Sequence, residues 1–252
     1  MHRKFDGVIK TVTVSKECDN TYYVSILVEE NIETKTKINK SVGIDLGIKS
    51  YIVDSNSKEI NNPKYLSKSL VKLAIEQRKL SHIKKDSINR NKQRIKVARL
   101  HHRIRNQRND FLHQLSSKYI NENQVIVLED LDIKQMEQDS TLSRVVADAS
   151  WSKFVSMLEY KGKWYGRDVI KVPTFYPSSQ LCSTCGYQNK ETKDLSIRKW
   201  VCPKCGTTHS RDHNASINIL NKGLDILKAR TLPVSSLKLD SKESLSEKPP
   251  LL

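Results

Sequence analysis

The stretch 41-SVGIDLGIKSYIVDSNSKEI-60 decides the fold class. It contains a short apolar run over 41–46, a turn with Gly47, and a second apolar run that ends in the polar segment 54–58. Short apolar runs separated by glycine and polar residues predict an antiparallel pair of strands. Asp45 stands inside the first run, where an unpaired carboxylate would be costly. We therefore expect Asp45 to have a partner.

Strand and helix patterns alternate along the rest of the chain. Alternating apolar residues on both sides of Asp19-Asn20 predict a hairpin over 7–30, and short apolar runs predict strands over 124–128 and 168–172. Apolar residues at helical spacing predict helices over 64–85, 88–122, 143–165 and 212–229. We expect an α/β fold in which residues 64–122 form an inserted helical hairpin.

The chain is strongly basic, with 44 Lys and Arg against 28 Asp and Glu and a formal net charge of +16. Between Lys64 and Arg108 there are fifteen basic residues and only two acids, Glu76 and Asp86. Basic residues along two helices can follow a phosphate backbone, although an ordinary solvated helix face is the alternative. The predicted nucleic-acid contacts are Arg78, Lys84, Lys85, Arg90, Arg94, Arg103, Arg105 and Arg108.

Two Cys-x-x-Cys pairs predict a metal site. Cys182 and Cys185 are separated by sixteen residues from Cys202 and Cys205, the spacing of a four-cysteine zinc ribbon, and a glycine follows each pair. Four sulfur ligands close the coordination sphere, so one structural Zn²⁺ is expected. A redox dithiol is the alternative. His209 and His213 lie close by, but four cysteines already suffice as ligands.

Three carboxylates stand on separate core elements. Besides Asp45, Glu129 ends the apolar run 125–128, and Asp212 opens the last helix. Each has an ordinary alternative, because strands hold structural acids and helix N-termini favour acidic residues. Together they can converge on a pair of Mg²⁺ or Mn²⁺ ions that leave coordination positions open for phosphate oxygens.

The motifs VGIDLGIKS, VIVLEDLDIKQM, YPSSQLCSTCG, CPKCG and RDHNASINIL, in that order, resemble the RuvC-like nuclease half of the TnpB family, transposon-associated relatives of the type V CRISPR effectors. The resemblance covers residues 7–222. It implies an RNase H-like fold with catalytic Asp45, Glu129 and Asp212, and with the ribbon inserted before the last helix. Asp130, Asp132 and Asp168 fall outside the implied catalytic positions.

The resemblance also implies a domain organisation. Residues 1–40 would be the end of a β-barrel domain, 41–180 the first part of the nuclease core, 181–207 the zinc ribbon, and 208–230 the final core helix. Residues 231–252 are biased towards Ser, Lys and Pro and are predicted to be a disordered tail.

Family members are usually longer and carry a recognition lobe before this region. We therefore expect a truncated copy, a fragment, or a second polypeptide that supplies the lobe. The first functional hypothesis is an RNA-guided DNA endonuclease whose partners are DNA and a transposon-derived guide RNA. The second is a nucleic-acid-binding module that does not cut, and a cut-and-paste transposase acting alone is a weaker third.

Smaller features complete the expectations. No apolar run reaches the roughly 18 residues of a membrane span, so a cytosolic protein is expected. A prokaryotic or viral origin is also expected. Core packing is expected for Trp151, Trp164 and Tyr176, and a buried strand position for Cys18. Because the ribbon lies next to Asp212, we also expect it to hold the start of the last helix.

Overall fold

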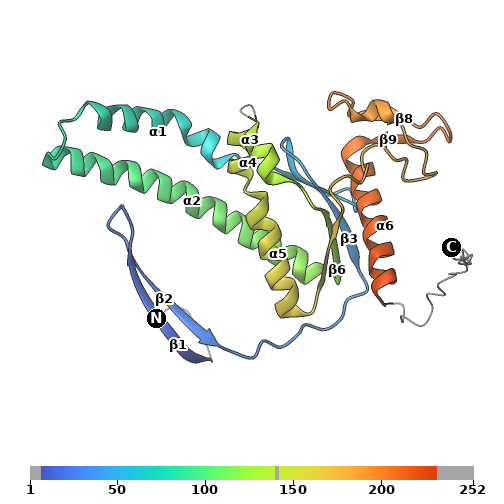
Figure 1. Ribbon diagram of the computed structural model, residues 1–252, viewed down its shortest axis with the longest axis horizontal. Coiled ribbons are helices and arrows are strands. Elements are labelled where there is room, and N and C mark those ends of the chain that lie inside the picture. The colour runs from blue at the N-terminus through green and yellow to red at the C-terminus, as the bar shows by residue number, and fades with distance from the viewer. Residues whose placement is uncertain (1–6, 140–141, 232–252) are drawn as a thin grey trace, which may run out of the picture.

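The computed structural model describes residues 7–139 and 142–231, and the predicted tail lies outside them except for Thr231. Its centre is a five-stranded sheet in the order β5-β4-β3-β6-β7. Figure 1 labels β3 and β6 of this sheet. The strands are β3 (Ser41–Leu46), β4 (Ser50–Asp54), β5 (Glu59–Asn61), β6 (Val125–Glu129) and β7 (Asp168–Val172). β3, β6 and β7 run parallel, whereas β4 and β5 are antiparallel additions. The predicted α/β class is confirmed.

Helices cover both faces of the sheet because successive side chains of a strand point to opposite sides. On one face Ile44, Ile126 and Leu128 pack against α2 (Ile88–Glu122) and α5 (Trp151–Tyr165) in the larger buried core. On the other face Val127 and its neighbours pack against α6 (Arg211–Thr231). Figure 1 shows α6 on the opposite side of the sheet from α2 and α5. The sheet is therefore buried on two sides, which suits parallel strands.

The approach of α6 to the sheet is unusually close. A Cβ atom at Gly43 would lie 2.1 Å from the carbonyl oxygen of Ser216 and 2.7 Å from the backbone nitrogen of Leu220. A Cβ atom at Gly223 would lie 2.2 Å from Cγ1 of Val127. Gly43 is thus required where the helix and strand backbones meet, and Gly223 is required where α6 meets the side chain of Val127. The two glycines set the distance between α6 and strands β3 and β6.

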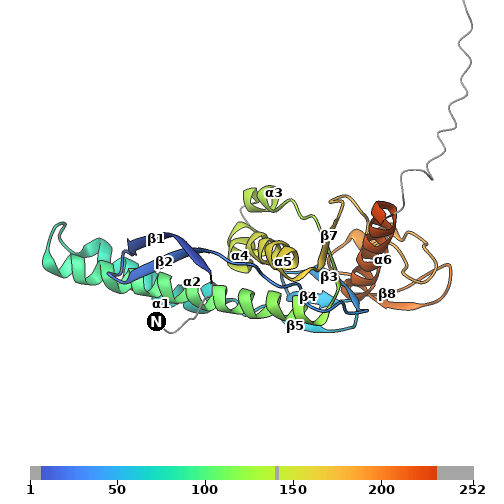
Figure 2. The ribbon, with the colours of Figure 1, turned by 90° about the horizontal axis from the view of Figure 1, so that it is seen from below.

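The basic hairpin consists of α1 (Tyr65–His82) and α2, which extend as a long pair away from the sheet, at the opposite end from α6 (Figure 2). Both helices lie within one residue of their predicted start, and α1 ends three residues early. Leu73 and Val97 are buried. No helix within residues 7–139 and 142–231 is long and apolar enough to cross a membrane.

The helix predicted over 143–165 is broken. Two helices, α4 (Ser143–Ala149) and α5, meet at Ser150, whose φ of 53° lies in the left-handed region. A short helix, α3 (Ile133–Gln138), was not predicted from the sequence. Asp132 caps it by accepting a hydrogen bond from the backbone N–H of Gln135 at 3.0 Å, which is a structural role for this acid.

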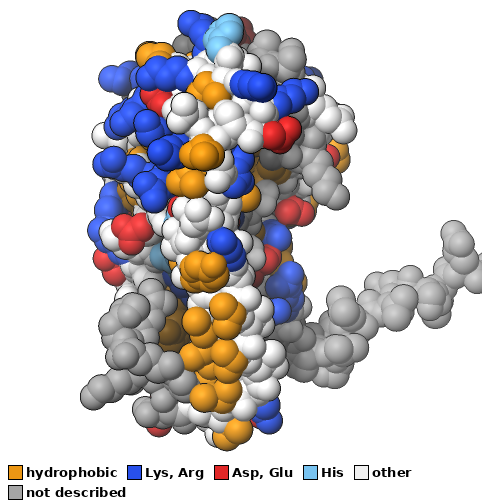
Figure 3. Space-filling model, turned by 90° about the vertical axis from the view of Figure 1, so that its left-hand side faces the viewer, with side chains coloured by type: hydrophobic (Ala, Val, Ile, Leu, Met, Phe, Trp, Pro, Cys, Tyr) orange, Lys and Arg blue, Asp and Glu red, His pale blue; other side chains and the backbone are white. Residues whose placement is uncertain are grey.

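The N-terminal hairpin, β1 (Val8–Lys16) with β2 (Tyr22–Glu29), lies apart from the sheet and is confirmed as an antiparallel pair. One face is apolar, and its cross-strand pairs are Ile9 with Val28, Val12 with Ile26, and Val14 with Val24. Ile26 and Val28 are half-buried, and the other four side chains are exposed. Figure 3 shows hydrophobic side chains gathered in a column over the hairpin, with Lys and Arg crowding the α1–α2 end above it.

The turn of this hairpin is tied to α2. His102 places Nδ1 2.6 Å from Oδ2 of Asp19, and its Nε2 is hydrogen-bonded to the hydroxyl of Tyr23. Arg105 donates to Oε1 of Glu17 at 2.9 Å. The hydrogen bond with His102 is the main cause that lowers the pKa of Asp19 to about 2. These contacts hold the hairpin against the basic helix at its turn.

Two side-chain expectations are wrong. Cys18 is exposed in the hairpin turn rather than buried in a strand, and Trp164 is 47% exposed, with its ring 4.6 Å from that of Tyr160. Trp151 is 2% exposed and belongs to the core, as expected. Tyr176 is partly buried against the core on the α6 side.

Asp148 joins three helices. Its carboxylate accepts hydrogen bonds from the backbone N–H groups of Leu66 and Ser67 at 3.1 and 3.3 Å, where α1 has no local side-chain cap. It also pairs with Arg108 of α2 at 2.9 Å, with only 5% of the Asp148 side chain exposed. One buried carboxylate thus ties α4 to the start of α1 and to α2.

The first prediction concerns Asp148→Ala. Removing one partner of a buried ion pair leaves the other uncompensated, so the free energy of unfolding should fall by about 3 kcal/mol. Urea unfolding followed by circular dichroism measures it. Asp110→Ala on the exposed side of α2 is the matched control and should change stability little. Equal effects of the two substitutions would contradict the role of Asp148.

Candidate functional site

Strand register places Asp45 and Glu129 side by side. Ile44 of β3 pairs with Leu128 of β6, so the next residues in these parallel strands, Asp45 and Glu129, are neighbours. Asp45 shares its face with Gly43, and Glu129 shares its face with Val127, which is the face covered by α6. Asp212 is the second residue of α6. The three predicted acids therefore lie on the same side of the sheet, near the start of α6.

Burial and neighbouring charges affect the ionisation of these carboxyl groups. Burial raises the pKa of Asp45 well above its usual value, and the negative charges of Glu129 and Asp212 raise it further. Burial also raises the pKa of Glu129, against a hydrogen bond from Ser178 that lowers it. Like charges at one site oppose ionisation unless a cation compensates them. The donor set of carboxylate oxygens is the one that Mg²⁺ and Mn²⁺ prefer.

Two contacts at this site were missed from the sequence. Nη1 of Arg198 lies 3.3 and 3.4 Å from the two carboxylate oxygens of Asp212, and the hydroxyl of Ser178 donates to Glu129. Ser178 lies in the motif YPSSQ, which could have indicated a role at this site. No motif or residue spacing in the sequence indicated a role for Arg198. Arg198 comes from the cysteine-rich segment, so that segment reaches into the carboxylate site.

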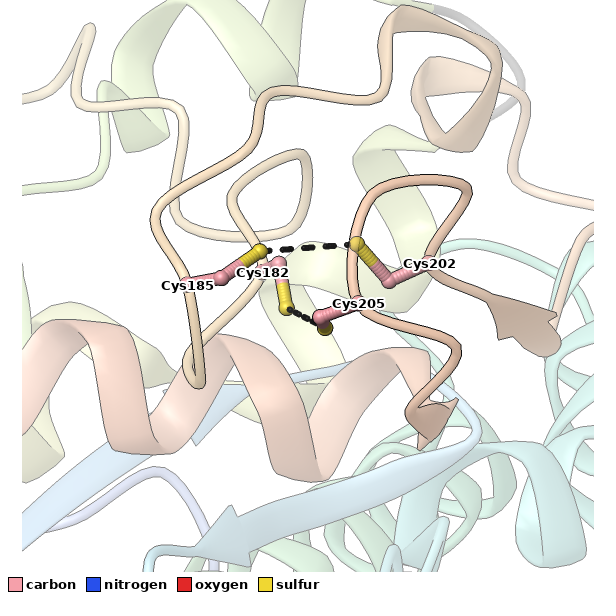
Figure 4. Close-up of side chains that lie close together, drawn as sticks. All are labelled: Cys182, Cys185, Cys202 and Cys205. Carbon is pink, nitrogen blue, oxygen red and sulfur yellow. Dashed lines mark hydrogen bonds between the residues drawn. The ribbon is translucent and has the colours of Figure 1, made fainter.

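The four cysteines converge as predicted. In the part of the chain that the structure describes, they are the one set of three or more acidic, Cys or His residues whose ligand atoms all lie within 4.8 Å of one another. The carboxylate oxygens of Asp45, Glu129 and Asp212 lie farther from one another than these four sulfur atoms do. Sγ of Cys182 lies 3.7 Å from that of Cys205, and Sγ of Cys185 lies 3.6 Å from that of Cys202 (Figure 4).

This geometry fits zinc. A tetrahedral ion with Zn–S bonds of about 2.3 Å separates its sulfur atoms by about 3.8 Å. Gly186 and Gly206 have φ of +73° and +72°, and their N–H groups donate to the carbonyls of Cys182 and Cys202 at 2.9 and 2.8 Å. The turns behind both cysteine pairs thus use the left-handed conformation that glycine permits.

Hydrogen bonds clamp the cysteine-rich segment to α6. Nδ2 of Asn214 donates to the carbonyl of Leu181 at 2.6 Å, and Oδ1 of Asn214 accepts from the N–H of Ser183 at 2.9 Å. Nε of Arg211 donates to the carbonyl of Thr192 at 3.0 Å. These bonds flank Asp212 and Cys182, and they attach the start of α6 to the cysteine-rich segment.

The segment has little secondary structure of its own. It contains a 3-10 helix over Lys190–Lys193 and the antiparallel pair β8 (Lys199–Val201) and β9 (Thr208–Ser210). β9 continues directly into α6. The predicted segments 181–207 and 208–230 therefore share this hairpin.

The two histidines near the cysteines are not part of the four-sulfur set. His213 places Nε2 3.0 Å from the hydroxyl of Ser57, and His209 is buried beside Cys182. Burial lowers the pKa of His209.

The basic residues predicted to bind nucleic acid fall into two groups. Arg90 donates to the carbonyls of Leu80 and Ile83 at 2.8 and 2.9 Å and closes the turn between α1 and α2, and Arg108 pairs with Asp148. The exposed members are Arg78, Lys84, Lys85, Arg94, Arg103 and Arg105. The exposed members suit contact with phosphates, and nucleic-acid binding by all eight stays a prediction.

Comparison with known proteins shows the family. Residues 9–140, which are 132 of the 252, match the OrfB_IS605 family model, described as a probable transposase. Residues 151–219 match the TNB domain of the Cas12f1-like proteins. The chain therefore belongs to the OrfB/IS605 family, which is the TnpB family that the motifs predicted.

Curated relatives carry related names. The chain is 44% identical over 214 residues to a protein of Streptomyces pristinaespiralis named "Putative RNA-guided DNA endonuclease", covering 85% of this chain and 53% of the relative. It is 35% identical over 241 residues to InsQ of Escherichia coli K12, with the same description, covering 89% and 59%. The chain thus spans little more than half the length of these relatives.

Solved structures show the same fold. A cryo-EM structure of a Cas12f1–sgRNA–target DNA complex matches with a TM-score of 0.53 at 19% identity, over 84% of this chain and 65% of that chain. A CRISPR–Cas12f ternary complex matches with a TM-score of 0.54 at 23% identity, over 83% and 44%. At these identities the likeness concerns the fold alone.

The second prediction separates the two candidate metal sites. Cys205→Ser should lower the zinc content of the purified protein from about one ion per chain and reduce its stability, because one thiolate is lost. Asp212→Ala should leave the zinc content unchanged. Elemental analysis after gel filtration measures both. Equal zinc contents in Cys205→Ser and the unaltered protein would contradict a four-cysteine zinc site.

Proposed function

We propose that this chain carries the nuclease centre of a transposon-associated, RNA-guided DNA endonuclease of the TnpB type. The observation that carries the proposal is the meeting of Asp45 and Glu129, on adjacent parallel strands, with the α6 start that holds Asp212. The names of the longer relatives support the same activity.

The strand order supports an RNase H-like core of the RuvC type. Three parallel strands are extended by two antiparallel ones, and α6 returns across the parallel part. We assign residues 41–180 and 208–230 to this core, with the helical hairpin 64–122 and the zinc ribbon 181–207 as insertions. The hairpin within residues 1–40 is proposed to belong to a β-barrel domain, and its exposed apolar face supports this.

The three carboxylates would hold Mg²⁺ or Mn²⁺. Two such ions, when bound, supply an activated water and stabilise the leaving oxygen of a phosphodiester. Ser178 holds Glu129 in place through its hydrogen bond, and Arg198 lies against Asp212. Arg198 thus neutralises one acid of the site and brings a positive charge to where a phosphate would enter.

The partners we propose are target DNA and a transposon-derived guide RNA. The exposed basic residues of α1 and α2 support a nucleic-acid partner because they are concentrated on one helical pair. A second polypeptide that supplies a recognition lobe stays a prediction. The alternative function is a nucleic-acid-binding module without guided cleavage, in which the exposed basic residues of α1 and α2 would hold RNA or DNA.

The third prediction tests catalysis. The purified chain is incubated with single- and double-stranded DNA, with and without co-purified RNA, in Mg²⁺ or in EDTA. Mg²⁺-dependent cleavage is expected, and Asp45→Asn should abolish it because a metal ligand loses its charge. Asp168→Asn, an exposed acid at the start of β7, is the matched control and should cleave normally.

Two results would overturn this proposal. One is the absence of Mg²⁺-dependent cleavage from every combination of DNA and RNA. The other is equal cleavage by Asp45→Asn and the unaltered chain. Salt-sensitive binding of RNA or DNA without cleavage would support the binding module instead.

The fourth prediction tests the basic surface. Arg103→Ala should weaken DNA binding uniformly across sequences and lower the slope of log affinity against log salt by about 1, because one phosphate contact is lost. Arg90→Ala is the comparison, since Arg90 is engaged in backbone contacts and its loss should lower stability. Fluorescence anisotropy from low to moderate salt measures binding. An unchanged slope for Arg103→Ala would remove it from the interface.

A further inference from the structure

His209 occupies a defined place beside the cysteine site. It lies on β9 with 7% of its surface exposed, and its Nε2 is 3.1 Å from Sγ of Cys182. Its cross-strand partner on β8 is Trp200, and the two rings lie 4.9 Å apart. The neighbouring strand thus holds the imidazole in one orientation, with one nitrogen aimed at sulfur.

The charge of the site explains why such a contact is useful. Four thiolates around one Zn²⁺ leave a net charge of −2, and Cys182 and Cys202 are both only 1% exposed. Buried negative charge is stabilised by N–H donors, and hydrogen bonds to an ionised acceptor are the stronger kind. A metal-bound thiolate only accepts, so Nε2 of His209 must carry the hydrogen.

His209 also lies on the path from the metal to the carboxylates. β9 ends at Ser210, Arg211 opens α6, and Asp212 follows three residues after His209. Arg211 donates its backbone N–H to the carbonyl of Arg198 at 2.9 Å, so the end of β9 is fixed on both sides. A contact that anchors β9 to the metal ligand therefore anchors the residue that precedes the carboxylate.

We propose that His209 is a positioning residue of the zinc ribbon, which donates Nε2–H to the Cys182 thiolate and thereby couples zinc binding to the start of α6. This rests on the proposed zinc occupancy of the four cysteines and on the proposed role of Asp212. His209 is not a ligand in this arrangement, because the four sulfur atoms complete the tetrahedron.

The experiment compares His209→Phe with His209→Gln. Phenylalanine keeps a ring against Trp200 and removes the donor, whereas glutamine keeps an N–H donor and removes the ring. His82→Phe, at an exposed position of α1, is the control. Competition with a chromophoric zinc chelator gives the zinc affinity, and visible absorption of the Co²⁺-substituted proteins gives the ligand set. Circular dichroism verifies the fold of each variant.

The zinc affinity of His209→Phe should fall about 10-fold, the lower range for loss of a residue that orients a metal ligand. His209→Gln should retain more affinity than His209→Phe, and His82→Phe should match the unaltered chain. The Co²⁺ spectra should show four sulfur ligands throughout. With His209→Phe, cleavage should fall at limiting zinc and recover when zinc is saturating.

Three outcomes would overturn the proposal. They are a zinc affinity of His209→Phe within twofold of the unaltered chain, a spectrum of three sulfurs and one nitrogen in the unaltered chain, and equal losses in both His209 variants. The zinc measurements need no nucleic acid. If the unaltered chain does not cleave while His209→Phe binds zinc more weakly, the nuclease function is refuted and the His209–Cys182 contact stands.

Discussion

The contact between α6 and strand β3 at Gly43 is the constraint on which the rest of the structure depends. The helix backbone approaches so closely that a single Cβ atom would collide with Ser216 and Leu220. This approach brings the N-terminus of α6 to the edge where β3 and β6 end. Asp45 and Glu129 point to that side of the sheet because of strand alternation, and Asp212 enters with the helix. A site made from residues 167 positions apart in the sequence thus follows from one backbone contact.

The cysteine-rich segment is attached to the N-terminal end of the same helix, α6. Its turns are built on Gly186 and Gly206, and Asn214 locks it to the first turns of α6. Arg198 extends from it to Asp212. The proposed zinc site is therefore linked through hydrogen bonds to a carboxylate that is proposed to hold catalytic metals. The chain also connects the two sites covalently, because the second cysteine pair is followed within residues 201–220 by the start of α6.

Periodic and spaced features could be predicted from the sequence, and contacts between distant segments could not. Strands β1 to β4, β6 and β7, the basic helical hairpin and the cysteine tetrad follow from apolar periodicity and ligand spacing. The short strands β5, β8 and β9 were not predicted. The break between α4 and α5 at Ser150 was not predicted, because residues 143–165 keep a helical sequence pattern on both sides of Ser150. The contacts of Arg198, Ser178 and Asp148 could not be predicted, because their partners lie 14, 49 and 82 positions away in the sequence. Trp164 and Cys18 were wrongly expected inside because hydrophobic character does not decide which side of an element faces the core.

The most direct test of this account is the unfolding of Gly43→Ala, combined with Mn²⁺ binding by the folded variant. The added methyl group must push α6 away from β3, so the free energy of unfolding should fall by at least about 2 kcal/mol, as in other overpacked cores. Mn²⁺ affinity should fall with it, while the four cysteines still bind zinc. A Gly43→Ala protein with unaltered stability and unaltered Mn²⁺ affinity would contradict the claim that this contact sets the carboxylate site.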